Sequence, residues 1–330
     1  WKMAGMAGSG ESSYTTYDRK ITSLAQNWLH EEAPKHQDKP WVLFVSLVAP
    51  HFPLTAPPEH FYRYYNDENL PWPKLYEEAR RPNHPFLKDY RESFVYDEFF
   101  ENDDMVRRAI AGYYGLVSFL DENIGKVLAV LDDVGLTDST NVIYTSDHGD
   151  NLGSRGLWGK STLYEESAGV PVIMAGPDIP QGKVVNTPVS HIDFYQTILD
   201  NVGMTLNDDE QKLPGKSLFA IAEDEDPERV VLCEYHGMGS TTGAFMISDG
   251  RYKYVYYVDY LAQFFDLQKD PEELDDIAAD PASADLVLYY HSRLLQICDP
   301  DEANARAKAR QAEQLARYGG REAVIARGDL

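Results

Sequence analysis

The feature that most constrains the fold is a long amphipathic helix followed closely by a short apolar strand. Apolar side chains in residues 110–131 recur at helical spacing, and Gly135 supplies a stop after them. Residues 140–146 then have the β-branched and aromatic composition of a strand. The apolar run 170–175 and the amphipathic stretch 191–202 repeat the alternation. Alternation of strands and helices predicts an α/β sheet with crossover helices.

The N-terminal part of the sequence fits the same plan. Residues 14–30 have apolar side chains at helical spacing, and residues 41–48 (WVLFVSLV) form a continuous apolar run. A run of that length predicts a strand buried on both faces of a parallel sheet. Residues 50–104 are rich in proline and aromatic side chains without a clear period, so we expect a long, mostly irregular segment there. We therefore predict a mostly parallel α/β sheet flanked by helices over residues 1–222.

The pattern changes at the acidic run 223–227 (EDEDP), which is typical of a linker. Four short β-rich runs follow, and Asp249-Gly250 between two of them is a strong hairpin signal. We predict a small antiparallel sheet with a covering helix over residues 223–299. Residues 300–330 are rich in alanine and arginine, so we expect a helical tail that acts as an oligomerisation arm. A tail folded back on its own subunit is the alternative.

The charge balance limits the partners that this chain can have. Its 330 residues carry 30 Lys and Arg against 54 Asp and Glu, a net charge of −24. So acidic a chain argues against nucleic acid and against anionic membrane, both of which attract basic clusters. No run of about 18 apolar residues occurs, and Cys233 and Cys298 cannot form a disulfide framework. We expect a cytoplasmic protein, and any targeting segment would precede Trp1.

The residues best suited to chemistry follow the predicted strand 140–146. Asp147 and His148 are adjacent, and a carboxylate with an imidazole can hold a divalent cation. Glycines between this pair and Lys160 allow tight turns, so Lys160 could bring positive charge to an anion held by the metal. The pair stands at the C-terminal end of a strand, where α/β sheets bind ligands. This position favours a metal site over a loop in which Asp147 only caps a turn.

Three further histidines were considered as site residues. His51 lies between prolines at the end of the run 41–48, which fixes its backbone direction, although a solvent-facing strand exit explains it equally well. His236 follows a predicted strand of the C-terminal part and could reach the site from there, whereas His191 is expected to pack at the start of a helix. The sequence has no dinucleotide loop, P-loop or serine nucleophile elbow. It therefore favours a metal-and-lysine site for an oxyanion, without a visible nucleophile.

Three segments carry a family resemblance: SDHGDNLGSRGLWGK at 146–160, WVLFVSLVAPHFP at 41–53, and the D-P-x-E-x-x-D segment at 270–276. Together they resemble the sulfatases of the alkaline-phosphatase superfamily, in the choline-sulfatase-like and phosphonate-monoester-hydrolase-like branch. The likeness covers nearly the whole chain from Tyr14 onward. It implies an alkaline-phosphatase-like α/β fold followed by a small antiparallel subdomain.

The resemblance also implies roles for individual residues. It implies Asp147 and His148 as metal ligands, and Lys160 and His51 as catalytic contacts to the sulfate group or its leaving oxygen. A metal and a lysine can neutralise charge there, and a protonated histidine can donate to the leaving oxygen. We retain His236 as a further substrate contact. Calcium is the first expectation for one divalent metal, and the His148 imidazole makes manganese or zinc the alternatives.

The implied activity is that of a sulfuric ester hydrolase acting on a small anionic sulfate ester, in a homo-oligomer such as a dimer or tetramer. The family nucleophile is a formylglycine made from Cys or Ser in a C/S-x-P-x-R motif, and neither Cys233 nor Cys298 fits that motif. The family's early paired aspartates would also precede Trp1. The chain thus resembles the C-terminal portion of a sulfatase and is expected to be incomplete for catalysis alone. The alternatives are hydrolysis of phosphonate monoesters or phosphodiesters, and a non-catalytic remnant that binds anions or a partner.

Overall fold

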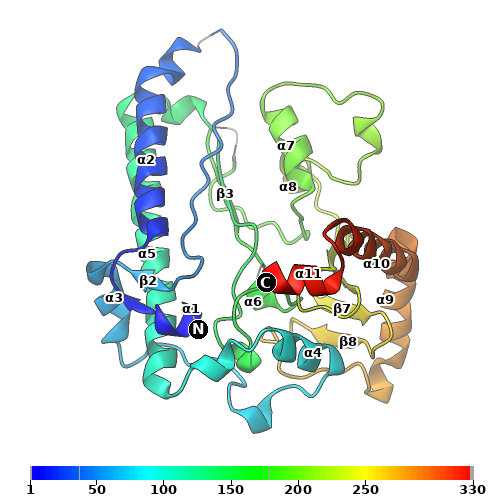
Figure 1. Cartoon of the computed structure of the whole chain (residues 1–330). Coiled ribbons are helices and arrows are strands. Elements are labelled where there is room, and N and C mark those ends of the chain that lie inside the picture. The colour runs from blue at the N-terminus through cyan, green and yellow to red at the C-terminus, as the bar shows by residue number, and fades with distance from the viewer. Residues whose placement is uncertain (1, 37, 178, 328–330) are drawn as a thin grey trace. The chain divides into compact units, whose positions relative to one another are not determined.

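The computed structural model describes residues 2–36, 38–177 and 179–327 (Figure 1). The chain divides into two compact units. No helix in these described ranges combines the length and the hydropathy that a bilayer crossing requires. The first unit comprises residues 1–81, 95–160 and 166–226, and the second comprises residues 82–94, 161–165 and 227–330.

The first unit is mostly helical, with short strands between the helices. Its helices are α1 (Lys2–Gly5), α2 (Ser13–Glu31), α3 (Pro58–Tyr65), α5 (Asp103–Asp133), α7 (Asp193–Asn201) and α8 (Leu218–Glu223). Helix α6 (Glu165–Ala168) also belongs to this unit except for its first residue, Glu165, which ends a segment of the second unit. Its strands are β1 (Gly8–Ser9), β2 (Thr55–Ala56), β3 (Val142–Thr145) and β4 (Val172–Ala175). Strands β1 and β2 pair in parallel, and β3 and β4 pair antiparallel. The predicted parallel pairing is therefore wrong for β3 and β4, because the chain between them, all of which the structure describes, holds only a 3-10 turn and the short α6 and no crossover helix. Single 3-10 turns cover Ala33–Lys35, Glu78–Arg80, Asp97–Phe99, Thr137–Ser139, Ser154–Gly156 and Glu210–Lys212.

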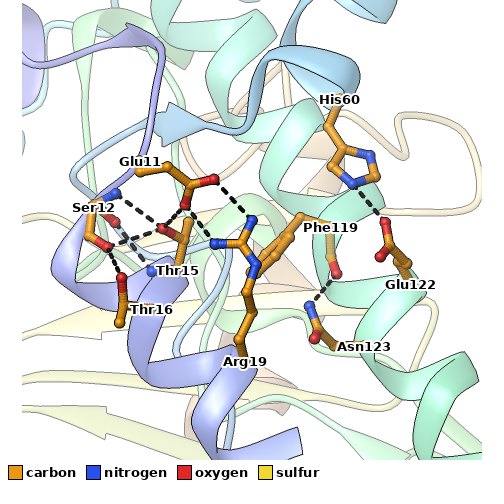
Figure 2. Close-up of polar contacts among 9 residues, drawn as sticks. All are labelled: Glu11, Ser12, Thr15, Thr16, Arg19, His60, Phe119, Glu122 and Asn123. Carbon is orange, nitrogen blue, oxygen red and sulfur yellow. Dashed lines mark hydrogen bonds and ion pairs between the residues drawn. The ribbon is translucent and has the colours of Figure 1, made fainter.

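Helix α2 begins with a capping box that also ties it to α5. Thr15 donates its N–H to Ser12 Oγ, and Ser12 donates its N–H to Thr15 Oγ1. Figure 2 shows Glu11 and Arg19 in an ion pair beside this cap. The Arg19 guanidinium lies 5.0 Å from the ring centre of Phe119 on α5, which adds a cation–π contact between the helices.

Helices α2 and α5 run side by side along most of α2 (Figure 1). In their buried interface Thr22 Oγ1 donates to Asn123 Oδ1 at 3.0 Å. Figure 2 shows the second bond of this amide, in which Asn123 Nδ2 donates to the carbonyl of Phe119. These two helices confirm the elements predicted over residues 14–30 and 110–131.

Two glycines let α5 approach β2 closely. A Cβ on Gly112 would lie 2.1 Å from the Leu54 carbonyl oxygen, and a Cβ on Gly115 would lie 2.8 Å from the Cβ of Ala56. Only glycine fits at such separations without moving the backbone. The core around this contact buries Leu54, Ala56, Phe61, Phe100, Val106, Ile110, Leu116, Phe119, Leu120 and Trp158.

Residues 41–48 differ from the prediction. They form no strand, alternate side chains along them are exposed, and Phe44 is 87% exposed. Within the part of the chain that the structure describes, no strand pairs with this segment, so the predicted strand buried on both faces is wrong. The segment 50–104 also differs, because it contains α3 and the second-unit helix α4 (Pro85–Ser93), each with a proline in its first turn.

The second unit contains the predicted antiparallel sheet. Its strands, in the order β5-β6-β7-β8, are β5 (Val231–Tyr235), β6 (Ala244–Ser248), β7 (Tyr252–Tyr257) and β8 (Gln263–Asp266). Its further helices are α9 (Ala284–Ile297), α10 (Pro300–Arg317) and α11 (Arg321–Arg327), with a 3-10 turn at Pro281–Ser283.

The hairpin between β6 and β7 is the one that Asp249-Gly250 predicts. Gly250 has a φ of 88°, and Asp249 Oδ1 accepts the N–H groups of Arg251 and Tyr252. Helix α9 covers the sheet through Tyr290 and Leu294.

Helix α10 packs along one side of this unit. Gly243 donates its N–H to Asn304 Oδ1, and Gln311 Nε2 donates to the carbonyl of His236. Many of its other side chains are exposed. The oligomerisation arm stays a prediction.

Replacing Gly112 with alanine is expected to lower the free energy of unfolding by about 1–3 kcal/mol, because the new methyl overlaps the Leu54 carbonyl. Gly125 on the same helix is the matched control. A Cβ there meets nothing within 4 Å, so Gly125→Ala is expected to stabilise by up to about 1 kcal/mol through helix propensity. Urea unfolding of both variants measures the difference. Equal effects at the two positions would contradict the close approach.

Candidate functional site

The candidate site lies in the first unit, where His51 meets two polar side chains of the loop 146–160. Lys160 Nζ lies 2.8 Å from His51 Nε2, and the ring centres of His51 and His148 are 6.0 Å apart. Asp147 adjoins His148. The structure therefore brings together the four first-unit residues that the sequence singled out.

Hydrogen bonding defines which nitrogen of His51 carries the proton. Nδ1 lies 2.8 Å from the Phe52 carbonyl oxygen, which can only accept, so Nδ1 donates. Nε2 keeps its lone pair and accepts from the Lys160 ammonium. Burial lowers the pKa of His51, and the nearby charges of Lys160 and His148 lower it further, against opposing effects of Phe52 and Asp150. His51 is therefore neutral at pH 7, which does not favour the protonated donor that the resemblance implies.

The backbone before His51 is held by Asp18, a buried residue on α2. Its carboxylate accepts the N–H of Val48 at 2.7 Å and that of Ala49 at 2.8 Å. Burial raises the pKa of Asp18, and these two hydrogen bonds oppose the rise. Sequence reasoning missed Asp18, because its partners are backbone groups about 30 residues away. The sequence could have indicated Asp18 only through its position, because it lies on the buried face of the helix together with Thr22, four residues later.

Asp147 and His148 present a pair of donors suited to a divalent cation. Asp147 Oδ2 lies 3.6 Å from His148 Nε2, and Asp147 Oδ1 accepts the N–H of His148. His148 Nδ1 donates to the Gly149 carbonyl at 2.8 Å, so Nε2 keeps the lone pair that a metal would need. The side chain of Asp147 is 86% exposed. Among the described residues no group of three or more His, Cys, Asp or Glu side chains gathers as a metal site, so this pair fits a metal only as part of a larger ligand set.

Asp150 and Asn151 hold the peptide groups on both sides of Gly159. Asp150 Oδ1 accepts the N–H of Gly159 at 3.0 Å and that of Leu152 at 2.8 Å. Asn151 donates its backbone N–H and its Nδ2 to the Gly159 carbonyl, at 2.7 and 2.6 Å. Because Lys160 follows directly, these bonds fix the base of its side chain. Burial raises the pKa of Asp150, while the N–H groups it accepts oppose the rise.

Sequence reasoning named neither Asp150 nor Asn151 as a site residue. The signal for them was weak, since both read as ordinary polar residues of a glycine-rich loop.

The turn between these residues is fastened by Arg155, whose side chain is fully buried. Its Nη1 lies 2.9 Å from Glu166 Oε1, and its N–H donates to the Lys74 carbonyl. Burial raises the pKa of Glu166, but the charges of Arg155 and Lys74 outweigh it, so the pKa is lowered. Arg155 has a φ of 59°, a conformation that a non-glycine residue adopts only when its surroundings hold it.

The remaining candidates have other contacts. His191 Nε2 donates to the Ser146 carbonyl at 2.8 Å, so His191 supports the backbone just before Asp147. His236 belongs to the second unit, where its Nε2 lies 3.5 Å from Glu234 Oε2, and its role in substrate binding stays a prediction. Burial raises the pKa of both Cys233 and Cys298, which makes each a weaker nucleophile at neutral pH.

Comparison with known proteins identifies the family. Residues 3–204 match the Sulfatase family model, and residues 153–299 match the model for the C-terminal region of N-sulphoglucosamine sulphohydrolase. The chain belongs to the sulfatase family, within the alkaline-phosphatase superfamily, as its motifs predict.

Individual relatives agree with this assignment. A choline-sulfatase from Rhizobium meliloti (strain 1021) is 32% identical over 285 residues, which are 84% of this chain and 55% of the relative. Arylsulfatase K from Homo sapiens is 30% identical over 282 residues, or 79% of this chain and 52% of the relative. The chain thus spans about half the length of the curated relatives it matches.

A solved structure confirms the predicted α/β fold. A phosphonate monoester hydrolase from Silicibacter pomeroyi matches with a TM-score of 0.68 and 27% identity. The match covers 84% of this chain and 59% of that one.

Replacing Lys160 with methionine is expected to raise the pKa of His51, because the change removes a neighbouring positive charge and keeps a similar side-chain volume. An NMR titration of the imidazole measures it. Lys74→Met is the control, since Lys74 pairs with Glu166 instead. A His51 pKa that is the same in Lys160→Met as in the parent would contradict the contact.

The same titration has a consequence for stability. The folded pKa of His51 lies below the unfolded value of about 6.5, so the unfolded chain takes up the proton more readily. The free energy of unfolding therefore falls as the pH drops below about 6.5 and levels off below the folded pKa. This loss should be smaller in Lys160→Met.

Asp147→Ala is expected to weaken the binding of a divalent cation to this chain by at least about tenfold, because it removes one of two donors. Calorimetric titration with Ca²⁺, Mn²⁺ and Zn²⁺ tests each metal in turn. Asp209→Ala, at a surface carboxylate, is the control. Tight binding that survives Asp147→Ala would rule out the assignment.

Proposed function

We propose that this chain supplies the metal-binding pair and the cationic group of a sulfuric ester hydrolase site. The observation that carries the proposal is the 2.8 Å contact between Lys160 and His51 next to the Asp147–His148 pair, in a member of the sulfatase family. A divalent cation on that pair, calcium first and manganese or zinc otherwise, would polarise the ester oxygens as a Lewis acid.

Lys160 would contact the sulfate group or its leaving oxygen. When the sulfur–oxygen ester bond breaks, negative charge grows on the leaving oxygen, and an ammonium placed there lowers the barrier. An ammonium has three N–H groups, so Lys160 can donate to His51 and to a substrate oxygen at the same time. His51, held neutral, would serve as the acceptor that directs the ammonium.

The nucleophile would come from elsewhere in the complete enzyme. The resemblance implies a formylglycine on a segment outside this sequence, so we expect no turnover by this chain alone. The substrate would be a small anionic sulfate ester, in line with the sulfatase names of the choline-sulfatase and arylsulfatase K relatives. We also propose a homo-oligomer formed through the C-terminal helices.

A second candidate is hydrolysis of phosphonate monoesters or phosphodiesters. Two features favour it: the likeness to the Silicibacter pomeroyi phosphonate monoester hydrolase, and the imidazole of His148, which is one of the two proposed metal ligands. Both reactions would use the same charges, because each transfers an anionic tetrahedral group to a nucleophile.

In the complete enzyme, Lys160→Ala is expected to lower kcat/KM by about two powers of ten, the usual loss for one charge partner of the transition state. Lys212→Ala, at an exposed lysine of the same unit, is the control and should change nothing. Assays with an aryl sulfate and an aryl phosphonate separate the two candidates. Unchanged turnover in Lys160→Ala would refute the role, and no turnover of either ester would favour the non-catalytic alternative.

A further inference from the structure

Lys253 on β7 is a fully buried lysine that the proposed reaction does not use. Its ammonium lies 2.8 Å from Glu273 Oε1 and 2.5 Å from Glu165 Oε1. It also donates to the carbonyl of Leu163 at 3.1 Å. Glu273, whose side chain is buried too, is the glutamate of the D-P-x-E-x-x-D segment at 270–276, to which the proposed function assigns no role.

Together the two buried charges hold the short segment 161–165. Lys253 binds the Leu163 carbonyl and the Glu165 carboxylate, and Glu273 Oε2 accepts the N–H of Glu165 at 2.6 Å. Buried charges are costly unless their partners are in place, so these contacts strongly specify where the segment lies. The arrangement does more than pair two charges, because both charges also bind main-chain atoms.

The segment begins immediately after Lys160. At most about 11 Å of chain separates Lys160 from Leu163, so few conformations are open to the link once Leu163 is fixed. On the other side of Lys160, Gly159 is held by Asp150 and Asn151.

We infer that Lys253 and Glu273 are positioning residues that fix the chain on the C-terminal side of Lys160. The inference rests on the proposed function, in which Lys160 contacts the anionic substrate. It also gives Glu273 of the D-P-x-E-x-x-D segment a function, which is to hold the N–H of Glu165 in the segment that follows Lys160.

The test replaces the buried pair with apolar residues of similar size, in Lys253→Met/Glu273→Leu. Apolar replacements of a buried ion pair commonly preserve folding. Here they also remove the hydrogen bonds to the Leu163 carbonyl and the Glu165 N–H and the ion pair with the Glu165 carboxylate. Asp266→Asn on the adjacent strand β8 is the matched control, because it breaks the ion pairs with Arg251 and Lys269 without touching the segment 161–165.

Two measurements distinguish an effect on the position of Lys160 from an effect on the stability of the fold alone. In this chain, amide exchange at Gly159 and Asn151 is expected to become about tenfold faster in the double variant and to stay unchanged in the control. In the complete enzyme, kcat is expected to fall about tenfold or more with little change in KM, measured well below the unfolding midpoint of each variant.

The possible outcomes are distinct. Unchanged exchange and unchanged kcat in the double variant, with a lower unfolding midpoint, would overturn the inference and leave a purely structural pair. If Lys160→Ala does not alter turnover, the proposed function fails, but faster exchange at Gly159 still supports positioning.

If the double variant does not fold, Glu165→Ala takes its place. The Glu165 side chain is 45% exposed, so this change removes one arm of the cluster at small cost to folding. A smaller shift of both readouts in the same direction supports the inference, and no shift overturns it.

Discussion

The contact between the Lys160 ammonium and His51 Nε2 depends on both backbones being held, because a free lysine side chain samples many rotamers and rarely stays in one place. The hydrogen bonds around the site meet this requirement. Asp18 fixes the two N–H groups just before Pro50 and His51, and the Asp150–Asn151 pair fixes both peptide groups of Gly159. The geometry of the Lys160–His51 contact therefore rests on carboxylate and amide side chains that take no part in the contact itself.

The loop 146–160 also buries a charged side chain, and a buried charge is unfavourable unless an opposite charge lies beside it. Arg155 is buried with no exposed side-chain surface, and its ion pair with Glu166 keeps that carboxylate charged. A Cβ on Gly149 would lie 2.1 Å from the Glu166 carbonyl oxygen. The backbone next to His148 therefore packs directly on Glu166, the ion-pair partner of Arg155. The Asp147–His148 pair and the turn that leads to Lys160 thus share one support. Loss of either charge would remove the main opposite charge of the other in a buried place, which is more costly than losing a surface ion pair.

Sequence patterns predicted the parts of this structure that depend on local periodicity. The helical spacing in 110–131 and the Asp-Gly signal at 249–250 each describe contacts made by nearby residues, and both elements formed as predicted. The segment 41–48 failed, because a buried strand needs a neighbouring strand and none of the described residues supplies one. Asp147, His148 and Lys160 were found because they stand in one loop after a strand.

The supporting residues could not be predicted in the same way. Asp18 binds backbone N–H groups about 30 positions away, and Lys253 binds a carbonyl about 90 positions away. Backbone groups carry no sequence signature, so nothing in the residue types of either partner marks such a bond. The residue types of the D-P-x-E-x-x-D segment do not name the partners of Glu273, and the structure shows them to be Lys253 and the N–H of Glu165.

The charge of the whole chain bears on what this site can bind. A net charge of −24 creates a field that repels anions at a distance, so long-range attraction cannot supply an affinity for sulfate or phosphonate esters. Under the proposed function, such an affinity would arise within a few ångströms, from Lys160 and from a cation on Asp147 and His148. Short-range contacts of this kind lose strength steeply when a group moves by an ångström, because they depend on hydrogen-bond geometry as well as on charge. Under the proposed function, an acidic chain that binds an anion would need Lys160 to be held firmly, and Asp150 and Asn151 hold the peptide groups on both sides of Gly159, directly before it.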